Sequence, residues 1–254
     1  MDFDEAVTPF SFQNGSPVGI LILHGFTGNP WRVRHWGERL SQAGFDIEGP
    51  LLCGHGSTWR DFGQCRWQDW RNDAEHALAK LKERCTAVFV GGLSMGGVLT
   101  LDLASRHPEI KGILLANPAL YIAKGWLLAL TVPWLKYFVK SIKAGASDIK
   151  DKSVAMPAYK RTPLEAVHQL LKLTREVRKE LGQVAQPALI LVSRSDHVVP
   201  TRSPRLVRDR IASEHKEWVW LENSYHGATQ DYDKDYLADR SIAFVRELIQ
   251  EAQA

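Results

Sequence analysis

Short runs of β-branched and aliphatic residues alternate with amphipathic segments along most of this chain, and no other feature restricts its fold as strongly. The apolar runs cover residues 18–23, 45–51, 87–90, 112–116, 188–192 and 218–221. Between them apolar residues recur at helical spacing, as in the set Trp67, Trp70, Ala74, Ala77 and Leu81. Strands that alternate with helices are typical of a parallel sheet with helices on both faces. The sequence therefore predicts an α/β fold.

The alternation breaks between residues 118 and 183. This insertion of about 65 residues is too long for an ordinary connection between a strand and a helix. Ligands bind at the carboxyl ends of parallel strands, and a long insertion there can cover them. We therefore predict a core made of residues 1–117 and 184–254, with residues 118–183 as a cap, or lid.

Composition limits the classes of protein to which the chain can belong. Its 254 residues include 32 basic and 29 acidic side chains, and a net charge of +3 is too small to favour nucleic acid as a partner. The acidic start, residues 1–5, lacks the features of a signal peptide. The apolar stretch 126–139 is too short to span a bilayer, so we expect no transmembrane segment. The cysteines Cys53, Cys65 and Cys85 have no metal-like spacing, and we expect reduced thiols and a cytoplasmic location.

A nucleophile motif follows one predicted strand. Residues 92–96 read Gly-Leu-Ser-Met-Gly and match G-x-S-x-G, a pattern that is weak when it stands alone. Here strand 87–90 precedes it and a helix begins near Met95. That context is typical of the nucleophile elbow, a strained turn that holds a serine at the end of the sheet. The flanking glycines are needed because a Cβ there would clash with neighbouring backbone. The sequence predicts Ser94 as the nucleophile of a serine hydrolase.

Acyl transfer also needs two backbone N–H donors for the oxyanion of the tetrahedral intermediate. One is expected from Met95, the residue after the nucleophile. The other is expected from the loop after the first main strand, where residues 24–28 read His-Gly-Phe-Thr-Gly. Gly25 lets this loop approach the substrate, and we predict the N–H of Phe26 as the second donor. His24 is expected to brace the loop and not to act as a base.

The acid and the base follow from chain order, which in this kind of site runs Ser, Asp or Glu, then His. The loop after strand 188–192 contains one carboxylate, Asp196. The loop after strand 218–221 contains one histidine, His226. A buried carboxylate orients the imidazole and stabilises its cation. The sequence therefore predicts Ser94, Asp196 and His226 as a catalytic triad.

Other polar residues near these loops are expected to have structural roles. His197 follows the predicted acid but lies on the wrong loop for a base, and His55 is expected to be satisfied by backbone contacts. The acidic run Asp231, Asp233 and Asp235 is interpreted as a solvated set that caps the final helix. Since no second ligand stands at metal spacing from His55, we predict no metal site.

Five segments together resemble a known family. Residues 24–28, 54–56, 92–97, 195–200 and 223–226 are similar to segments of bacterial monoacylglycerol lipases and their carboxylesterase relatives. The resemblance implies an α/β-hydrolase fold, with a mostly parallel central sheet flanked by helices and a small helical cap. It also implies hydrolysis of aliphatic carboxylic esters through an acyl-serine intermediate, without a cofactor. One departure is that residues 155–161, in the cap, hold no carboxylate to accept hydrogen bonds from glycerol, so carboxylesterase is the broader expectation.

The expected partner is a small acyl ester, with an optimum at medium chain length and poor turnover of triacylglycerols. Other triad chemistries on this fold, such as C–C hydrolysis, nitrile lyase activity or cofactor-free perhydrolysis, are alternatives, as is a ligand-binding module without turnover. The sequence does not indicate an oligomeric state. Apolar side chains in the cap are expected to line an acyl-chain tunnel or to attach the cap to the core, and to allow transient contact with lipid surfaces. They are Trp126, Leu127, Leu128, Leu130, Val132, Trp134, Leu135, Tyr137, Phe138 and Val139.

Overall fold

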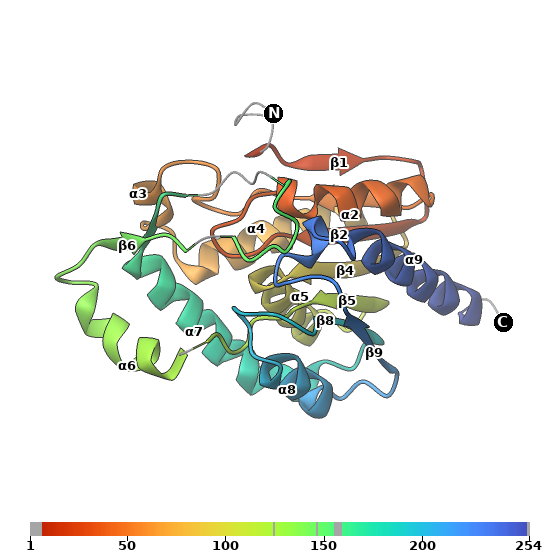
Figure 1. Cartoon of the computed structure of the whole chain (residues 1–254). Helices are drawn as coiled ribbons and strands as arrows, with labels where there is room; N and C mark the ends of the chain where they lie inside the picture. Colours follow the sequence, from red (N-terminus) through yellow and green to blue (C-terminus); the bar gives the residue numbers. More distant parts are fainter. Residues whose placement is uncertain (1–6, 124, 146, 155–158, 253–254) are drawn as a thin grey trace.

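A mostly parallel sheet forms the centre of the molecule (Figure 1). The computed structural model describes residues 7–123, 125–145, 147–154 and 159–252. Within these residues seven strands pair in the order β1-β3-β2-β4-β5-β8-β9, and only β1 runs antiparallel to its neighbour. The strands are β1 (Phe10–Phe12), β2 (Val18–Leu23), β3 (Asp46–Gly49), β4 (Ala87–Leu93), β5 (Gly112–Ala116), β8 (Ala188–Ser193) and β9 (Lys216–Leu221).

Helices cover both faces of the sheet because each strand directs alternate apolar side chains to opposite sides. In β2, Ile20 and Ile22 belong to one core cluster, whereas Leu21 and Leu23 belong to the other. The first cluster is closed by α2 (Trp31–Gln42) and α9 (Lys234–Glu251). The second is closed by α4 (Trp67–Lys82), α5 (Met95–Arg106), α7 (Leu164–Glu180) and α8 (Arg202–Arg210). The chain therefore folds as three layers with the sheet in the middle.

The inserted stretch 118–183 contains two parts that pack differently. The first part is α6 (Gly125–Leu135) with a two-stranded antiparallel sheet of β6 (Ser141–Lys143) and β7 (Arg161–Pro163), and it projects at the left of Figure 1. The second part is α7, which buries Leu170, Leu173 and Val177 in the same core cluster as α5. Residues 155–158, which include part of the stretch expected to lack a headgroup carboxylate, lie outside the described residues.

Several short elements complete the fold, and the sequence pattern does not predict them. They are β1, β6, β7, α3 (Trp59–Phe62) and two 3₁₀ turns, η1 (Leu181–Gln183) and η2 (Ala228–Gln230). Each has only three or four residues, too few to show a hydrophobic period. Among the residues that the structure describes, no helix is both long and apolar enough to cross a membrane.

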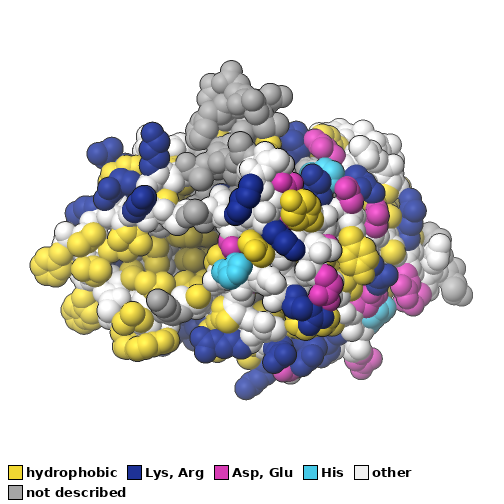
Figure 2. Space-filling view, in the orientation of Figure 1, with side chains coloured by type: hydrophobic (Ala, Val, Ile, Leu, Met, Phe, Trp, Pro, Cys, Tyr) yellow, Lys and Arg dark blue, Asp and Glu magenta, His cyan; other side chains and the backbone are white. Residues whose placement is uncertain are grey.

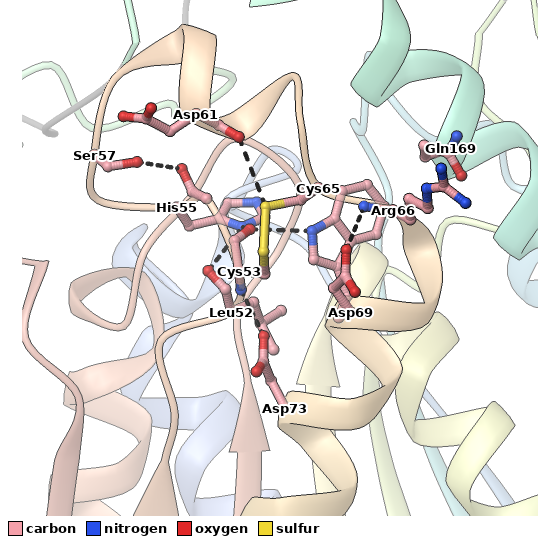
Figure 3. Close-up of a disulfide and its surroundings, with 12 residues drawn as sticks. Leu52, Cys53, His55, Ser57, Asp61, Cys65, Arg66, Asp69, Asp73 and Gln169 are labelled. Atoms are coloured by element: carbon pink, nitrogen blue, oxygen red, sulfur yellow. Dashed lines mark hydrogen bonds between the residues drawn. A yellow bond between two sulfur atoms is a disulfide. The ribbon is translucent and has the colours of Figure 1, made fainter.

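The expectation of three reduced thiols is wrong for two of the cysteines. Cys53 and Cys65 form a disulfide, with their Cα atoms 6.1 Å apart (Figure 3). Cys85 is a buried free thiol. The turn of α3 lies between the two cysteines and folds the loop back on itself, so residues 12 positions apart in sequence meet in space. Because disulfides are rare in reducing compartments, the expected cytoplasmic location loses one of its supports.

Candidate active site

Ser94 lies at a sharp turn between β4 and α5, with φ = 59°, a conformation that costs a non-glycine residue strain. Close packing around the turn enforces it. A Cβ on Gly92 would lie 2.2 Å from the carbonyl carbon of Gly96, and a Cβ on Gly96 would lie 2.0 Å from the carbonyl oxygen of Leu23. Both distances are far below contact distance, which confirms the predicted need for glycine on either side of the serine.

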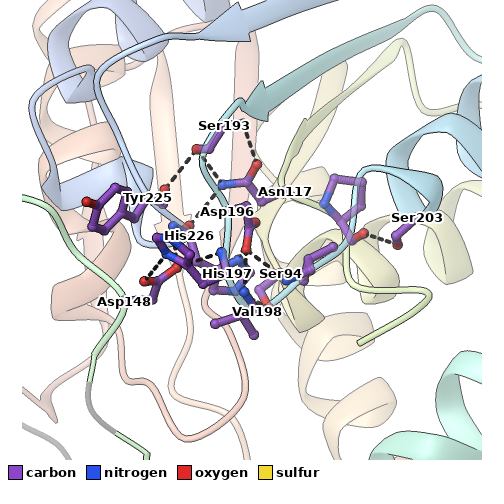
Figure 4. Close-up of polar contacts among 12 residues, drawn as sticks. Ser94, Asn117, Asp148, Ser193, Asp196, His197, Val198, Ser203, Tyr225 and His226 are labelled. Carbon is purple, nitrogen blue, oxygen red and sulfur yellow. Dashed lines mark hydrogen bonds and ion pairs between the residues drawn. The ribbon is translucent and has the colours of Figure 1, made fainter. Parts of the chain in front are cut away.

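The structure brings the predicted acid, base and nucleophile into one hydrogen-bonded chain (Figure 4). His226 Nε2 lies 2.9 Å from Ser94 Oγ, and His226 Nδ1 lies 2.7 Å from Asp196 Oδ2. The other carboxylate oxygen, Oδ1, accepts hydrogen bonds from the backbone N–H groups of Val198 and Val199, at 2.8 and 2.7 Å. Both carboxylate oxygens of Asp196 are therefore engaged, and only 5% of its side chain is exposed.

The loop with the predicted oxyanion donor lies directly against the nucleophile. A Cβ on Gly25 would lie 3.2 Å from Ser94 Cβ, tighter than most real contacts, so glycine suits the close approach of the loop to the nucleophile. The loop closes on itself through a hydrogen bond from Gly28 N–H to Gly25 O, 3.0 Å long, and Thr27 has φ = 56°. The Phe26 side chain packs against other rings of the core. Across the site, α5 begins at Met95, so the positive end of its dipole faces the nucleophile.

His24 braces this loop, as predicted, and the buried His55 beside it is satisfied by backbone contacts, also as predicted. The backbone N–H of Leu52 donates to His24 Nε2, so His24 carries its proton on Nδ1 and donates it to Gly25 O, 3.0 Å away. Burial lowers the pKa of His24 to about 4. Burial also lowers the pKa of His55 well below its usual value, and its Nδ1 lies 3.1 Å from the carbonyl of Cys53. Both rings are therefore neutral at pH 7 and serve as hydrogen-bonding struts.

A polar network that the sequence did not predict holds the backbone of the loop that carries His226. Asn117, directly after β5, donates from Nδ2 to the carbonyl of His226 (2.9 Å) and to Ser193 Oγ (2.9 Å). Its Oδ1 accepts from Ser193 N–H at 2.8 Å, and Ser193 Oγ donates to Tyr225 O. Asn117 has φ = 45°, a conformation that asparagine tolerates better than most residues. The sequence signal that could have indicated this role is an asparagine directly after a predicted strand.

The acidic run after His226 is not a solvated helix cap, and that prediction is wrong for two of its three members. Asp231 is buried and accepts the backbone N–H of Tyr225, and Asp233 is buried and accepts that of Asn223. Neither side chain caps α9. Asp235 does lie at the surface, where it forms ion pairs with α2. The physical reason is that buried backbone N–H groups need acceptors, and these two carboxylates supply them for Tyr225 and Asn223.

His197, which was predicted not to be the base, pairs with a carboxylate from the inserted stretch. Its Nδ1 lies 2.9 Å from Asp148 Oδ1, and its ring packs edge-on against Tyr225 (Figure 4). Asp148 comes from the inserted stretch, and sequence reasoning missed it because nothing local connects it with loops that follow about 50 and 80 residues later.

A cavity of about 480 Å³ opens between α6, α7 and the loop after β5. Ser94 and His226 are not among its lining residues, but Ala119, which lines it, donates its backbone N–H to the backbone carbonyl of Ser94. Of the ten apolar residues expected to form a tunnel, Trp126 lines this cavity. Val132 is buried against α7, and most of the others are exposed at the surface. Most of these side chains are exposed because only one side of α6, which includes Leu128 and Val132, packs against α7.

The fold and this site together define an α/β-hydrolase with a serine nucleophile elbow. A family model described as "Serine aminopeptidase, S33" (Hydrolase_4) matches residues 17–233, and the chain belongs to this family. It is 41% identical to the thermostable monoacylglycerol lipase of Bacillus sp. (strain H-257), over 93% of both chains. It is 28% identical to a carboxylesterase of Bacillus subtilis (strain 168), over 94% of this chain and 96% of the relative.

Solved structures agree with these relatives. A structure described with LipS and LipT, two metagenome-derived lipolytic enzymes, superposes with a TM-score of 0.89 at 39% identity and covers 95% of this chain and 98% of the other. A soluble variant of monoglyceride lipase from Saccharomyces cerevisiae shares the fold, with a TM-score of 0.80 at 18% identity over 94% and 91% of the chains. The chain is therefore an enzyme, a serine hydrolase of the lipase and carboxylesterase kind. This confirms the predicted family and fold.

Proposed function

We propose that this enzyme hydrolyses carboxylic esters with short to medium aliphatic acyl chains, monoacylglycerols among them, through an acyl-Ser94 intermediate. The observation that carries the proposal is the continuous chain Ser94–His226–Asp196, with contacts of 2.9 and 2.7 Å, at a strained elbow. The names of the relatives at 41% and 28% identity support the same substrate class.

In the first half-reaction, His226 Nε2 takes the proton of Ser94 Oγ as that oxygen attacks the ester carbonyl. The carbonyl oxygen becomes an oxyanion and accepts hydrogen bonds from the N–H groups of Phe26 and Met95. Asp196 accepts a hydrogen bond from the Nδ1–H of His226, which fixes the tautomer and stabilises the imidazolium without transfer of that proton. The tetrahedral intermediate then breaks its bond to the alcohol oxygen, which leaves with the proton from His226 Nε2.

In the second half-reaction, water replaces the alcohol. His226 Nε2 accepts a proton from that water as it attacks the acyl-Ser94 carbonyl, and the same two N–H donors hold the second oxyanion. When this intermediate breaks the bond to Ser94 Oγ, His226 returns the proton to the serine and a carboxylic acid leaves. The cycle uses only groups of the chain and water.

The cavity between α6 and α7 is the proposed site for the acyl chain, with residues 118–183 as the cap over it. Its apolar walls include Leu120, Ile122, Trp126 and Leu171. Each methylene buried there contributes up to about 0.8 kcal/mol, so kcat/KM should rise with chain length until the cavity is full. A volume of about 480 Å³ holds one acyl chain and excludes the three chains of a triacylglycerol.

The test combines active-site labelling with a substrate series. A fluorophosphonate should label the wild type at Ser94 and leave Ser94→Ala unlabelled. The value of kcat/KM for p-nitrophenyl esters from acetate to palmitate should peak at medium length, and monoacylglycerol should be cleaved faster than triolein. Labelling of Ser94→Ala would refute the nucleophile assignment. A steady fall from acetate would refute the acyl site, and preference for triolein emulsions would refute the small-cap substrate class.

We also propose that the exposed side of α6 and its following turn contacts lipid surfaces transiently. The α6 patch, which consists of Trp126, Leu130, Trp134, Tyr137 and Phe138, has side chains that are 66% to 85% exposed. Hydrophobic side chains gather there at the left of Figure 2. Large aromatic groups exposed together are typical of a surface that meets an apolar phase.

Sedimentation with neutral phosphatidylcholine vesicles tests this contact. The wild type should sediment with the vesicles, and Phe138→Asp should sediment less, while both cleave water-soluble p-nitrophenyl acetate at the same rate. Tyr232→Asp is the matched control, because Tyr232 is an exposed aromatic residue outside the patch, and it should sediment like the wild type. Equal sedimentation of all three proteins would contradict the proposal.

A further inference from the structure

One carboxylate from the inserted stretch lies between the loops that carry the predicted acid and base. Asp148 Oδ2 accepts hydrogen bonds from the backbone N–H of His197, at 3.1 Å, and of His226, at 3.2 Å. Its Oδ1 pairs with His197 Nδ1 at 2.9 Å, and only 15% of the Asp148 side chain is exposed (Figure 4). A single side chain therefore ties the backbone of the Asp196 loop to that of the His226 loop.

The backbone around Asp148 is fastened to the same place. The N–H of Gly227 donates to the carbonyl of Asp148 at 2.9 Å. In the opposite direction, the buried Asp231 accepts the N–H groups of Lys150 and Asp151, at 2.8 and 3.0 Å. Asp148 thus binds the backbone of the His226 loop, and Asp231, which lies in that loop, binds the backbone of segment 148–151.

Side-chain packing also holds segment 148–151 against the His226 loop. A Cβ on Gly227 would lie 2.6 Å from Ile149 Cγ1, so Ile149 occupies the space that any larger residue would need. Ile149 itself is buried. Segment 148–151 cannot shift without moving the backbone at His226, and a movement of the catalytic imidazole by about 1 Å costs on the order of 100-fold in rate.

We propose that Asp148 is a positioning residue for His226, and that it is the point through which the inserted stretch controls the triad. This inference rests on the proposed function, because it assumes that His226 is the base for Ser94. A carboxylate suits the task better than a neutral side chain, since hydrogen bonds from N–H groups to an ionised acceptor are roughly twice as strong as neutral ones. An amide in its place would also present an NH₂ group to backbone donors.

The experiment compares Asp148→Ala and Asp148→Asn with a matched control, Asp151→Ala. Asp151 lies three residues further on, and among the described residues its side chain accepts hydrogen bonds from Ser153 alone, in its own turn. With p-nitrophenyl acetate and octanoate, Asp148→Ala should lose about 10- to 100-fold in kcat on both esters, with KM little changed. Asp148→Asn should fall between Asp148→Ala and the wild type, and Asp151→Ala should stay within about twofold of the wild type. Titration with a fluorophosphonate to completion gives the concentration of folded sites in each sample, so partial unfolding does not enter kcat.

Three outcomes are decisive. Equal loss on both esters, confined to kcat, supports the positioning role. A loss that appears only on octanoate and only in KM would overturn it, because Asp148 would then merely hold the cap over the acyl site. Unchanged kinetics in Asp148→Ala would overturn it too, while an active wild type leaves the proposed function intact. If the wild type cleaves no ester, or if Ser94→Ala does, the proposed function fails instead.

Discussion

Lowering the pH from 7 to 5 should destabilise the folded enzyme through two buried histidines, His24 and His55. Burial holds the pKa of His24 at about 4 in the folded chain, against an ordinary value of 6.5. Between these values the unfolded state binds more protons than the folded state. Stability is therefore lost as the pH falls through 6.5, until His24 itself becomes protonated near 4.

The magnitude follows from the two pKa values of His24. The loss is about 2 kcal/mol at pH 5 and about 3 kcal/mol when it is complete. His55, whose pKa is also lowered by burial, adds to the loss in the same direction. Since domains are stable by about 5–15 kcal/mol, a loss of this size is readily measured.

Urea unfolding followed by circular dichroism at pH 7, 6 and 5 tests the reasoning. The free energy of unfolding of the wild type should fall by at least about 2 kcal/mol between pH 7 and 5. His24→Gln should be less stable at pH 7, because it loses the struts to Gly25 and Leu52, but its fall should be smaller by about that amount. His76→Gln, which replaces an exposed histidine, is the control and should follow the wild type. An equal fall in His24→Gln and the wild type would refute the assignment.

Three further substitutions have simple expected results. Ser94→Ala should reduce kcat for p-nitrophenyl esters by at least about 10³-fold, and a variant that kept a tenth of the activity would contradict the triad. Gly96→Ala directs a Cβ against the Leu23 carbonyl and should melt well below Gly182→Ala, whose Cβ meets nothing within 4 Å; equal melting temperatures would refute the packing argument. Cys53→Ser opens a loop of 12 residues and should lower the free energy of unfolding by about 3 kcal/mol, and an unchanged urea midpoint would mean that the purified protein lacks the disulfide.

The sheet and the predicted site residues could be found from the sequence because their signals are local. A buried strand needs only a run of five or six apolar residues, and β2 and β5 match their predicted bounds. The elbow around Ser94 combines a strand, two glycines and a helix within ten residues. Asp196 and His226 were found because each was the only suitable side chain in a loop after a strand. The structure brings all three side chains together.

The rest depends on contacts between distant parts of the chain. Asp231 was expected to be solvated because its neighbours in sequence are polar. It is buried, and its carboxylate accepts hydrogen bonds from backbone N–H groups of the inserted stretch. Asp148 meets loops that follow it by about 50 and 80 residues, and no spacing rule connects them. Cys53 and Cys65 pair because of a turn that no periodicity marks. In each case the partner is chosen by the fold, so the role becomes visible only after the fold is known.

The place of the insertion also affects how the chain is made. Strands β5 and β8 are neighbours in the sheet, and Ile113 of β5 pairs with Ala188 of β8. Because Ala188 is synthesised about 75 residues later, β5 cannot form this pairing until then. At a synthesis rate of roughly 5 to 20 residues per second, the ribosome needs about 4 to 15 seconds to cover that distance. During this interval β5 is an unpaired apolar edge in a half-built sheet, open to strands of other nascent chains. The expression yield should therefore depend on translation speed through residues 118–183 and on chaperones that shield the edge until β8 emerges.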